Sequence, residues 1–155
     1  MSDACPPPGI KKYDRYDTAT YAPYPRSVPL ARRNVARLTA LWGQDALVAD
    51  AALIAGELCA NAVLHGCLRD RLFRVETSLT GGVLRITVTD PKGERLPEPR
   101  QAGADEQFGR GLLLVRAVAT RWAVEKLTVG KSVWAELDTS GTVPQALNTS
   151  RLSGE

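Results

Sequence analysis

Apolar residues recur with a helical period in the first half of the chain. Residues 30–42 place leucine, valine and tryptophan side chains on one face and are followed by Gly43, which predicts an amphipathic helix with Ser27 as its N-cap. A second apolar run, residues 46–64, is long enough to span a membrane but contains two carboxylates, each of which is costly in lipid. We therefore expect a buried helix of a soluble protein that ends at Gly66.

The period changes to two in the second half of the chain. Four segments alternate apolar and polar residues: 72–79, 83–89, 123–128 and 132–137. The first two flank Gly81 and Gly82 and the last two flank Gly130, so each pair predicts a β-hairpin. Between the hairpins, residues 111–121 predict a short helix, whereas residues 91–108 show no pattern and predict a lid, a binding loop or disorder.

This order of elements predicts an α/β two-layer sandwich of the α+β kind, in which helices cover one face of a mixed, mainly antiparallel sheet. The 155 residues suffice for one domain with a core that needs neither disulfides nor metal. We place this domain at residues 24–138, because residues 1–23 and 139–155 lack periodicity and are expected to be flexible tails. Within the first tail, residues 21–24 are compatible with an edge strand.

Charge and cysteine content argue against several classes of function. The formal charge of +3 comes from 20 basic and 17 acidic residues that are interleaved along the chain, so direct nucleic-acid binding is not favoured. Three cysteines without a Cys-x-x-Cys pair, together with a single histidine, favour a reducing compartment over a disulfide framework or a structural zinc site. The N-terminus lacks the apolar stretch of a signal peptide, so we expect a cytoplasmic protein without membrane attachment.

The second predicted helix carries a polar stripe. Its members are Asp50, Glu57, Asn61 and His65. At about 100° per residue, these four lie within about 80° of one another around the helix axis. A solvated helix side explains such a stripe equally well, although Ile54 and Leu58 lie on or beside it and neither Lys nor Arg does. A carboxylate and a carboxamide one turn apart, as in Glu57 and Asn61, can hold a general base beside an oxygen-ligated metal.

A second motif opens the short predicted helix. Gly109 and Gly111 flank Arg110 and precede Leu112, directly after the long loop. Glycines allow the backbone to approach a ligand closely, and the free N–H groups at a helix start attract phosphate. The motif lacks both the dinucleotide-binding glycine fingerprint and the Gly-Lys-Ser/Thr ending of a P-loop. A lid hinge is therefore an equal alternative.

A third candidate, Asp90, closes the strand predicted at residues 83–89. Its side chain can point into a pocket at the end of the sheet and accept a hydrogen bond from an exocyclic amine such as that of adenine. Aspartates at strand ends are more often turn formers, so Asp90 alone does not define a site.

In this order, the motifs resemble those of the GHKL superfamily, in its branch of stand-alone anti-sigma factor serine/threonine kinases. Residues 57–66 are similar to the N box of that family, Asp90 to its G1 box and residues 109–112 to its G2 box. Residues 130–134 are similar to the terminal strand motif, in which a hydroxyl, here that of Ser132, supports the adenine pocket. The resemblance extends over the whole predicted domain and implies the Bergerat ATP-binding fold of histidine-kinase-like ATPases.

The resemblance also implies roles for individual residues. Glu57 would orient or deprotonate the acceptor hydroxyl, Asn61 would ligate a Mg²⁺ ion that bridges the ATP phosphates, and Asp90 would bind the adenine amine. Further nucleotide contacts would come from His65 and from the motif made of Gly109, Arg110, Gly111 and Leu112. Lys92 and Glu94 stand where the G1 box of the family has glycines, and the ammonium of Lys92 could reach a phosphate.

Two functions remain open on this basis. The first is a Mg-ATP-dependent serine/threonine protein kinase that phosphorylates an antagonist protein, an anti-anti-sigma factor, and regulates a sigma factor by binding it. Phosphoryl transfer mainly requires positioning and charge neutralisation, so Glu57 and Asn61 favour this enzyme. The alternative is a non-catalytic, nucleotide-sensing module that sequesters a partner, and Lys92 in the altered G1 box favours it. A homodimer is compatible with both.

Overall fold

The computed structural model describes residues 13–66, 71–90, 112–127 and 130–139. The elements in chain order are β1 (Arg15–Tyr21), α1 (Ser27–Leu41), the 3-10 helix η1 (Asp45–Leu47), α2 (Val48–Gly66), β2 (Phe73–Thr80), β3 (Val83–Asp90), a helix at residues 112–118, β4 (Arg121–Lys126) and β5 (Lys131–Asp138).

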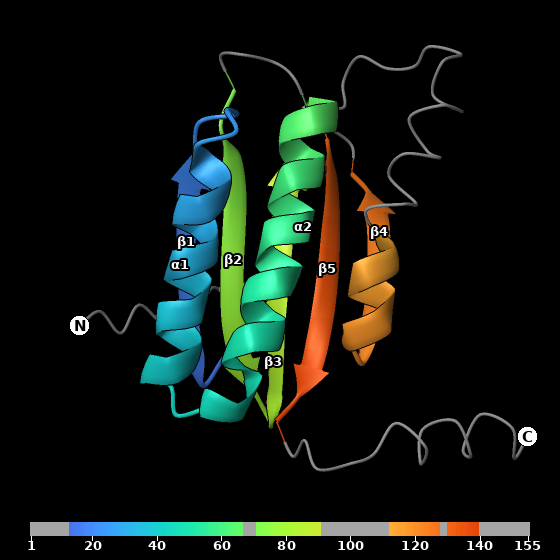
Figure 1. The fold of residues 1–155 in the computed structure, drawn as a ribbon. Helices are drawn as coiled ribbons and strands as arrows, with labels where there is room; N and C mark the ends of the chain where they lie inside the picture. Colours follow the sequence, from blue (N-terminus) through green and yellow to red (C-terminus); the bar gives the residue numbers. More distant parts are fainter. Residues whose placement is uncertain (1–12, 67–70, 91–111, 128–129, 140–155) are drawn as a thin grey trace, which may run out of the picture.

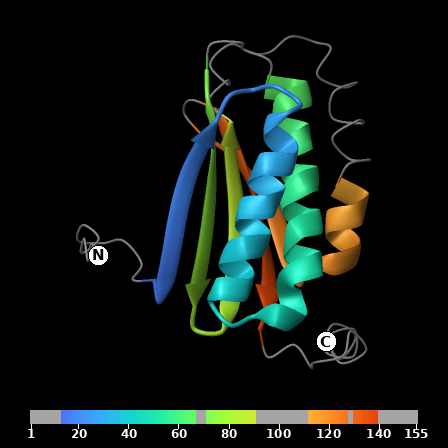
Figure 2. The same cartoon turned by 60° about the vertical axis from the view of Figure 1, so that its left-hand side comes forward.

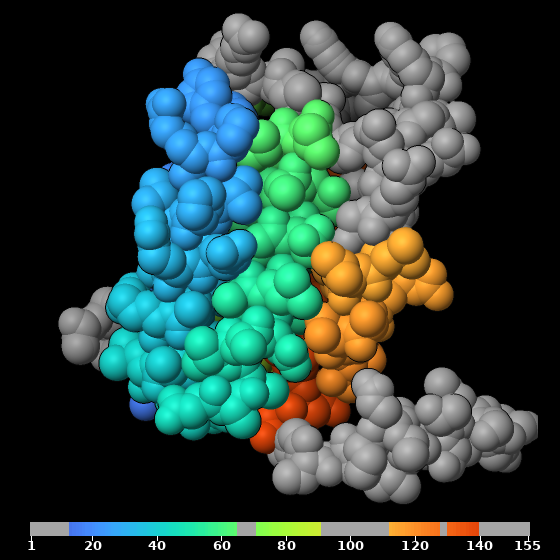
Figure 3. Space-filling view, viewed as in Figure 1, coloured from blue at the N-terminus to red at the C-terminus, as the bar shows by residue number. Residues whose placement is uncertain are grey.

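The strands form one sheet with the order β1-β2-β3-β5-β4. Helices α1 and α2 and the helix at residues 112–118 lie on the same face of this sheet (Figures 1 and 2). In the space-filling view of Figure 3, the three helices cover most of the sheet behind them. The predicted two-layer α+β sandwich is confirmed. We predicted a mixed sheet, but every pairing between the described strands is antiparallel.

Both predicted hairpins are present. Strands β2 and β3 are joined at Gly81 and Gly82, whose φ angles of 54° and 79° are those of a tight hairpin turn that favours glycine. Strands β4 and β5 pair antiparallel on either side of a connection that contains Gly130, with φ of 93°. Glycine therefore permits both turns.

The core lies between the helices and the sheet. Alternate residues of β3, namely Leu84, Ile86 and Val88, are buried there. Helix α2 contacts β3 and β5 and buries the following apolar residues: Ala51, Ile54, Ala55, Leu58, Cys59 and Ala62. By length and composition alone, the stretch Asp45–Leu64 could cross a membrane. Its packing on the sheet identifies α2 as the core helix that the sequence predicted.

The first strand corrects the predicted domain boundary. The expected flexible tail at residues 1–23 is wrong for residues 15–21, because they form β1 and pair with β2 along their whole length. The ring of Tyr21 lies 5.7 Å from that of Phe73 and anchors the end of this edge strand. The other parts of the predicted tails, residues 1–12 and 140–155, lie outside the described residues.

Two helix ends also differ from the expectation. Ser27 is the first residue of α1 and not its N-cap, since its hydroxyl donates to the carbonyl oxygen of Ala22 at 2.7 Å. The short helix ends at residue 118 and not at 121, because Arg121 already begins β4. Trp122, the second residue of β4, packs against the core from that strand.

Cys59 makes stability depend on pH at the alkaline end. Its side chain is fully buried, and burial raises the pKa of the thiol from 9.0 to about 12. The unfolded chain releases this proton near the ordinary value while the folded protein retains it, so stability falls as the pH rises from 9 towards 12. We expect the free energy of unfolding, measured by urea denaturation, to fall with rising pH more steeply in the wild type than in Cys59→Ala. The difference in slope should reach up to about 1.4 kcal/mol per pH unit. Equal slopes would contradict this assignment.

Candidate functional site

Two of the three sequence motifs can be located in the structure, and they lie at the same end of the domain. Helix α2 ends at Gly66 beside the end of β3 that carries Asp90, as both Figure 1 and Figure 2 show. Of the third motif, residues 109–112, the structure describes Leu112 alone. Lys92 and the side chain of His65 also lie outside the described residues.

Asn61 is the most unusual side chain at this end. It is only 5% exposed, and its amide nitrogen Nδ2 has no hydrogen-bond partner among the described residues. A buried donor without a partner costs about 1–3 kcal/mol, so native proteins seldom keep one without a reason. Asn61 therefore does not belong to a solvated helix side.

The chemistry of this amide suits an anionic ligand. The unpartnered atom is a donor, and a phosphate oxygen is an acceptor that would satisfy it. The carbonyl oxygen Oδ1 of the same side chain is the kind of hard oxygen ligand that Mg²⁺ takes. The nitrogen of the Asn61 amide can thus donate to a phosphate while its oxygen ligates the metal ion.

Glu57 lies one helical turn before Asn61. Residues four apart on a helix are neighbours on its surface, with Cβ atoms roughly 5–6 Å apart. Glu57 is half-buried, and no hydrogen bond or ion pair engages its carboxylate among the described residues. Its neighbours on the helix, Ile54 and Leu58, are fully buried, so Glu57 lies at the boundary of the buried surface of α2. A carboxylate at such a boundary is accessible to a substrate hydroxyl and can act as a general base.

Asp90 is the last residue of β3 and is 6% exposed. It follows the buried Leu84, Ile86 and Val88 at intervals of two, so it faces the helices. An ionised carboxylate accepts hydrogen bonds and donates none, which makes Asp90 suited to an exocyclic amine. The sequence-based position of Asp90 at the end of a strand is correct.

Ser132 lies elsewhere than expected. The register pairs Thr89 with Ser132 and Asp90 with Lys131. Because successive residues of a strand point to opposite faces, Ser132 points away from the helices, where it lines a groove with Thr87. The Ser132 hydroxyl and the Asp90 carboxylate thus lie on opposite faces of the sheet, and a role of Ser132 in the adenine pocket stays a prediction.

Lys131 and Lys126 are the residues that sequence reasoning missed. Lys131 is paired with Asp90 on one side and with Lys126 on the other, which places the three in a row across β3, β5 and β4 on the helix-covered face. Directly paired residues have Cβ atoms roughly 4.5–5.5 Å apart. Lys131 directly faces the buried carboxylate of Asp90, whereas the exposed Lys126 lies one strand further away, so Lys131 is the cation better placed to meet a ligand bound at Asp90. Finding them requires the pairing of β3 with β5, which no local pattern reveals.

Leu112 begins the helix at residues 112–118 and is 3% exposed in the hydrophobic core. Its side chain therefore packs in the core, and any ligand contact at this position comes from the backbone. Among residues 13–66, 71–90, 112–127 and 130–139, no group of three or more His, Cys, Asp or Glu side chains is arranged to hold a metal ion. A Mg²⁺ ion fits here in the form that it usually takes with nucleotides, with one or two protein ligands and the remainder from phosphates and water.

An antiparallel sheet with helices on one face is an α+β architecture. The buried amide and the strand-end carboxylate at one end of it are typical of a nucleotide-binding class of domain. The family profile of the histidine kinase-like ATPase domain matches residues 21–137, from the end of β1 into β5. The chain belongs to this family. It is also similar to an uncharacterised protein of Streptomyces coelicolor, with 46% identity over 52 residues. That match covers 32% of this chain and 49% of the relative, so the chain aligns with about half of that protein.

Asn61→Leu tests whether this amide is kept for a ligand. The substitution keeps the number and branching of the side-chain heavy atoms and removes the unpartnered donor, so we expect the free energy of unfolding without ligand to rise by about 1 kcal/mol in urea denaturation. Thr39→Val is the matched control, because the Thr39 hydroxyl donates to the carbonyl of Val35 at 2.7 Å and its loss should lower stability. A marked loss of stability in Asn61→Leu would show that Asn61 has a structural role.

Proposed function

We propose that the chain is a Mg-ATP-dependent serine/threonine protein kinase of the anti-sigma factor type. The observation that carries this proposal is the unpartnered, buried amide of Asn61, one turn from the half-buried carboxylate of Glu57. Membership of the histidine kinase-like ATPase family supports ATP as the ligand. The Glu57 and Asn61 pair supports transfer of the phosphoryl group over binding alone.

Each residue has a distinct task in the proposed reaction. The exocyclic amine of adenine donates to Asp90, and the ammonium of Lys131 donates to a neighbouring acceptor of the nucleotide. Asn61 holds the phosphates. The acceptor hydroxyl oxygen attacks the γ-phosphorus as its proton passes to Glu57, and the bond to the β-phosphate oxygen breaks to release ADP. Bound Mg²⁺ would supply charge neutralisation on the phosphates.

The remaining nucleotide contacts stay predictions. His65, Lys92, Gly109, Arg110 and Gly111 are assigned by resemblance only, and their side chains or backbone lie outside the described residues. The protein partners are likewise proposed by resemblance: an anti-anti-sigma antagonist as the phosphoryl acceptor and a sigma factor as the regulated partner. We propose a cytoplasmic location, since this reaction requires an ATP pool.

A non-catalytic module that senses nucleotide and sequesters a partner is the second candidate. Lys92 and Glu94 stand where the G1 box of the family has glycines. Each replaces a residue without a side chain by a charged one, which favours altered nucleotide binding over transfer. Such a site can bind nucleotide in a geometry that does not support transfer.

Calorimetric titration with ATP and Mg²⁺ tests the binding site through its lysines. We expect Lys131→Met to weaken binding about tenfold, the equivalent of one charge-assisted hydrogen bond near a buried carboxylate. Lys126→Met is the matched control, because the exposed Lys126 should contribute less than about threefold. Unchanged affinity in Lys131→Met would remove Lys131 from the site. No binding by the wild type would contradict the ATP-binding proposal itself.

Glu57→Gln distinguishes the kinase from the sensing module. We expect this variant to bind ATP as the wild type does and to transfer the γ-phosphate to an antagonist protein about 100-fold more slowly, or slower still. Transfer is measured with labelled ATP and a panel of candidate antagonists. Asp50→Asn is the matched control, since Asp50 shares the stripe two turns away and should leave the rate unchanged. Equal transfer by wild type and Glu57→Gln would exclude Glu57 as the base, and no transfer to a verified partner would favour the module.

A further inference from the structure

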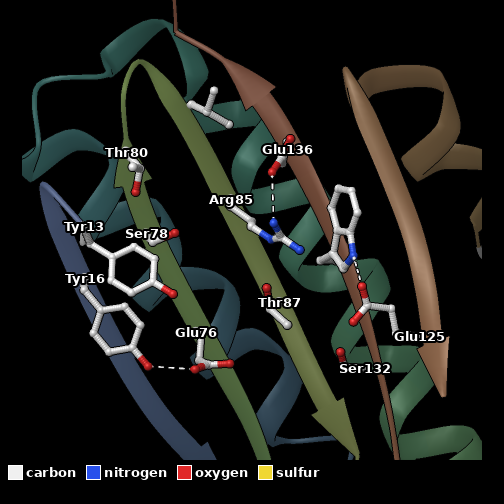
Figure 4. Close-up of a pocket in the computed structure, with 12 residues that line it drawn as sticks. Tyr13, Tyr16, Glu76, Ser78, Thr80, Arg85, Thr87, Glu125, Ser132 and Glu136 are labelled. Atoms are coloured by element: carbon white, nitrogen blue, oxygen red, sulfur yellow. Dashed lines mark hydrogen bonds and ion pairs between the residues drawn. The ribbon is translucent and has the colours of Figure 1, made fainter. Parts of the chain in front are cut away.

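The face of the sheet that points away from the helices carries a concave surface (Figure 4). We call it the open-face groove and define it by the side chains that shape its walls, namely Tyr16, Glu76, Arg85, Glu125, Trp134 and Glu136. Its volume is about 440 Å³, and all five strands border it with Tyr16 on β1 and Glu125 on β4 at its two sides. Asp90 lies on the other face, so this groove is separate from the candidate nucleotide site.

The walls of the groove are held in place by contacts within the chain. On one side, the Tyr16 hydroxyl donates to Glu76 at 2.7 Å and its ring stacks on Tyr13 with centroids 4.8 Å apart. Burial, and then Glu76, raises the pKa of Tyr16 to about 12, so this hydroxyl remains a donor. On the other side, the indole nitrogen of Trp134 donates to Glu125 at 3.2 Å. Because both walls are preorganised, their side chains lose little additional conformational entropy when a ligand binds.

Carboxylates outnumber cations in the groove. Among the described residues, Arg85 is the one basic side chain that lines it. Glu136 is engaged by Arg85 at 3.2 Å and by Arg121, from outside the groove, at 2.7 Å. Glu76 has Arg74 at 3.8 Å, but half of the Arg74 side chain is exposed to solvent. Glu125 is exposed and forms no ion pair within the part of the chain that the structure describes. The groove therefore presents negative charge at both sides and favours a cationic ligand.

The groove already accommodates one guanidinium group. The guanidinium carbon of Arg85 lies 4.0 Å from the centroid of the Trp134 ring, while Glu136 accepts a hydrogen bond from the same group. An aromatic ring and a carboxylate together suit arginine better than lysine, because guanidinium stacks on rings and donates in a planar fork. Tyr16 with Glu76 and Trp134 with Glu125 repeat this pairing of ring and carboxylate at the two sides.

We propose that the open-face groove binds an extended, arginine-containing segment of a protein partner. Neighbouring strands are roughly 4.8 Å apart, so the groove spans about 19 Å across five strands, the length of about six extended residues. Two arginines near the ends of such a segment reach Glu76 on one side and Glu125 on the other. This surface is independent of ATP chemistry and gives the domain a docking site on the face that the helices leave open.

The test uses the full chain and three capped eight-residue peptides in which glycine alternates with arginine, lysine or glutamate. We expect calorimetry at low ionic strength to show saturable binding of the arginine peptide at least fivefold tighter than the lysine peptide, with no binding of the glutamate peptide. Glu76→Gln and Glu125→Gln should each weaken binding about fivefold. Asp45→Asn, an exposed carboxylate at the start of η1 that does not line the groove, should leave it unchanged.

Each other outcome overturns the proposal. Equal affinity for the arginine and lysine peptides would reduce the groove to a general negative patch. Equal affinity in Glu125→Gln and the wild type would place the peptide elsewhere. Self-association of the wild type in sedimentation, abolished by Glu125→Gln, would identify a second copy of this chain as the occupant. None of these measurements depends on ATP, so the proposed kinase function can fail without affecting them.

Discussion

The packing of α2 on β3 and β5 is the constraint on which both the core and the candidate site depend. Ile54 and Leu58 hold this helix on the sheet, and Glu57 and Asn61 lie at the edge of the same buried surface. Apart from this packing, no contact in the described structure supports the proposed catalytic pair. Its position relative to Asp90 is set by how the apolar side chains of α2 fit between the strands, because closely packed interiors resist small displacements.

Strand alternation then divides the chemistry between two faces. Lys131 and Ser132 are neighbours in sequence, yet Lys131 joins Asp90 under the helices and Ser132 joins the open-face groove. A shift of one residue in the pairing of β3 with β5 would exchange them. The buried alternation of β5, with Val133, Ala135 and Leu137 facing the core, prevents such a shift. Hydrophobic burial thus determines which polar groups lie on each face of the sheet.

Local patterns predicted what depends on near neighbours in the chain. The helices and both hairpins follow from apolar periods and from glycines in the turns, and the helical spacing identified Glu57 and Asn61 together. Strand β1 escaped prediction because its centre consists of small residues and its partner β2 lies more than fifty residues away. The position of Ser132 and the burial of Asn61 could not be predicted for a related reason, since both depend on contacts between distant segments.

The unpartnered donor of Asn61 links the stability of the domain to its proposed ligand. A cost of about 1–3 kcal/mol is a large fraction of the roughly 5–15 kcal/mol by which a small domain is stable. A phosphate oxygen that accepts this hydrogen bond would remove the cost, and the gain would appear as binding free energy. An amide already hydrogen-bonded within the protein would not provide this gain. Because a ligand that binds only the folded state also stabilises it by mass action, the folded population rises with nucleotide concentration. The feature that weakens the free domain is therefore the one that strengthens the complex.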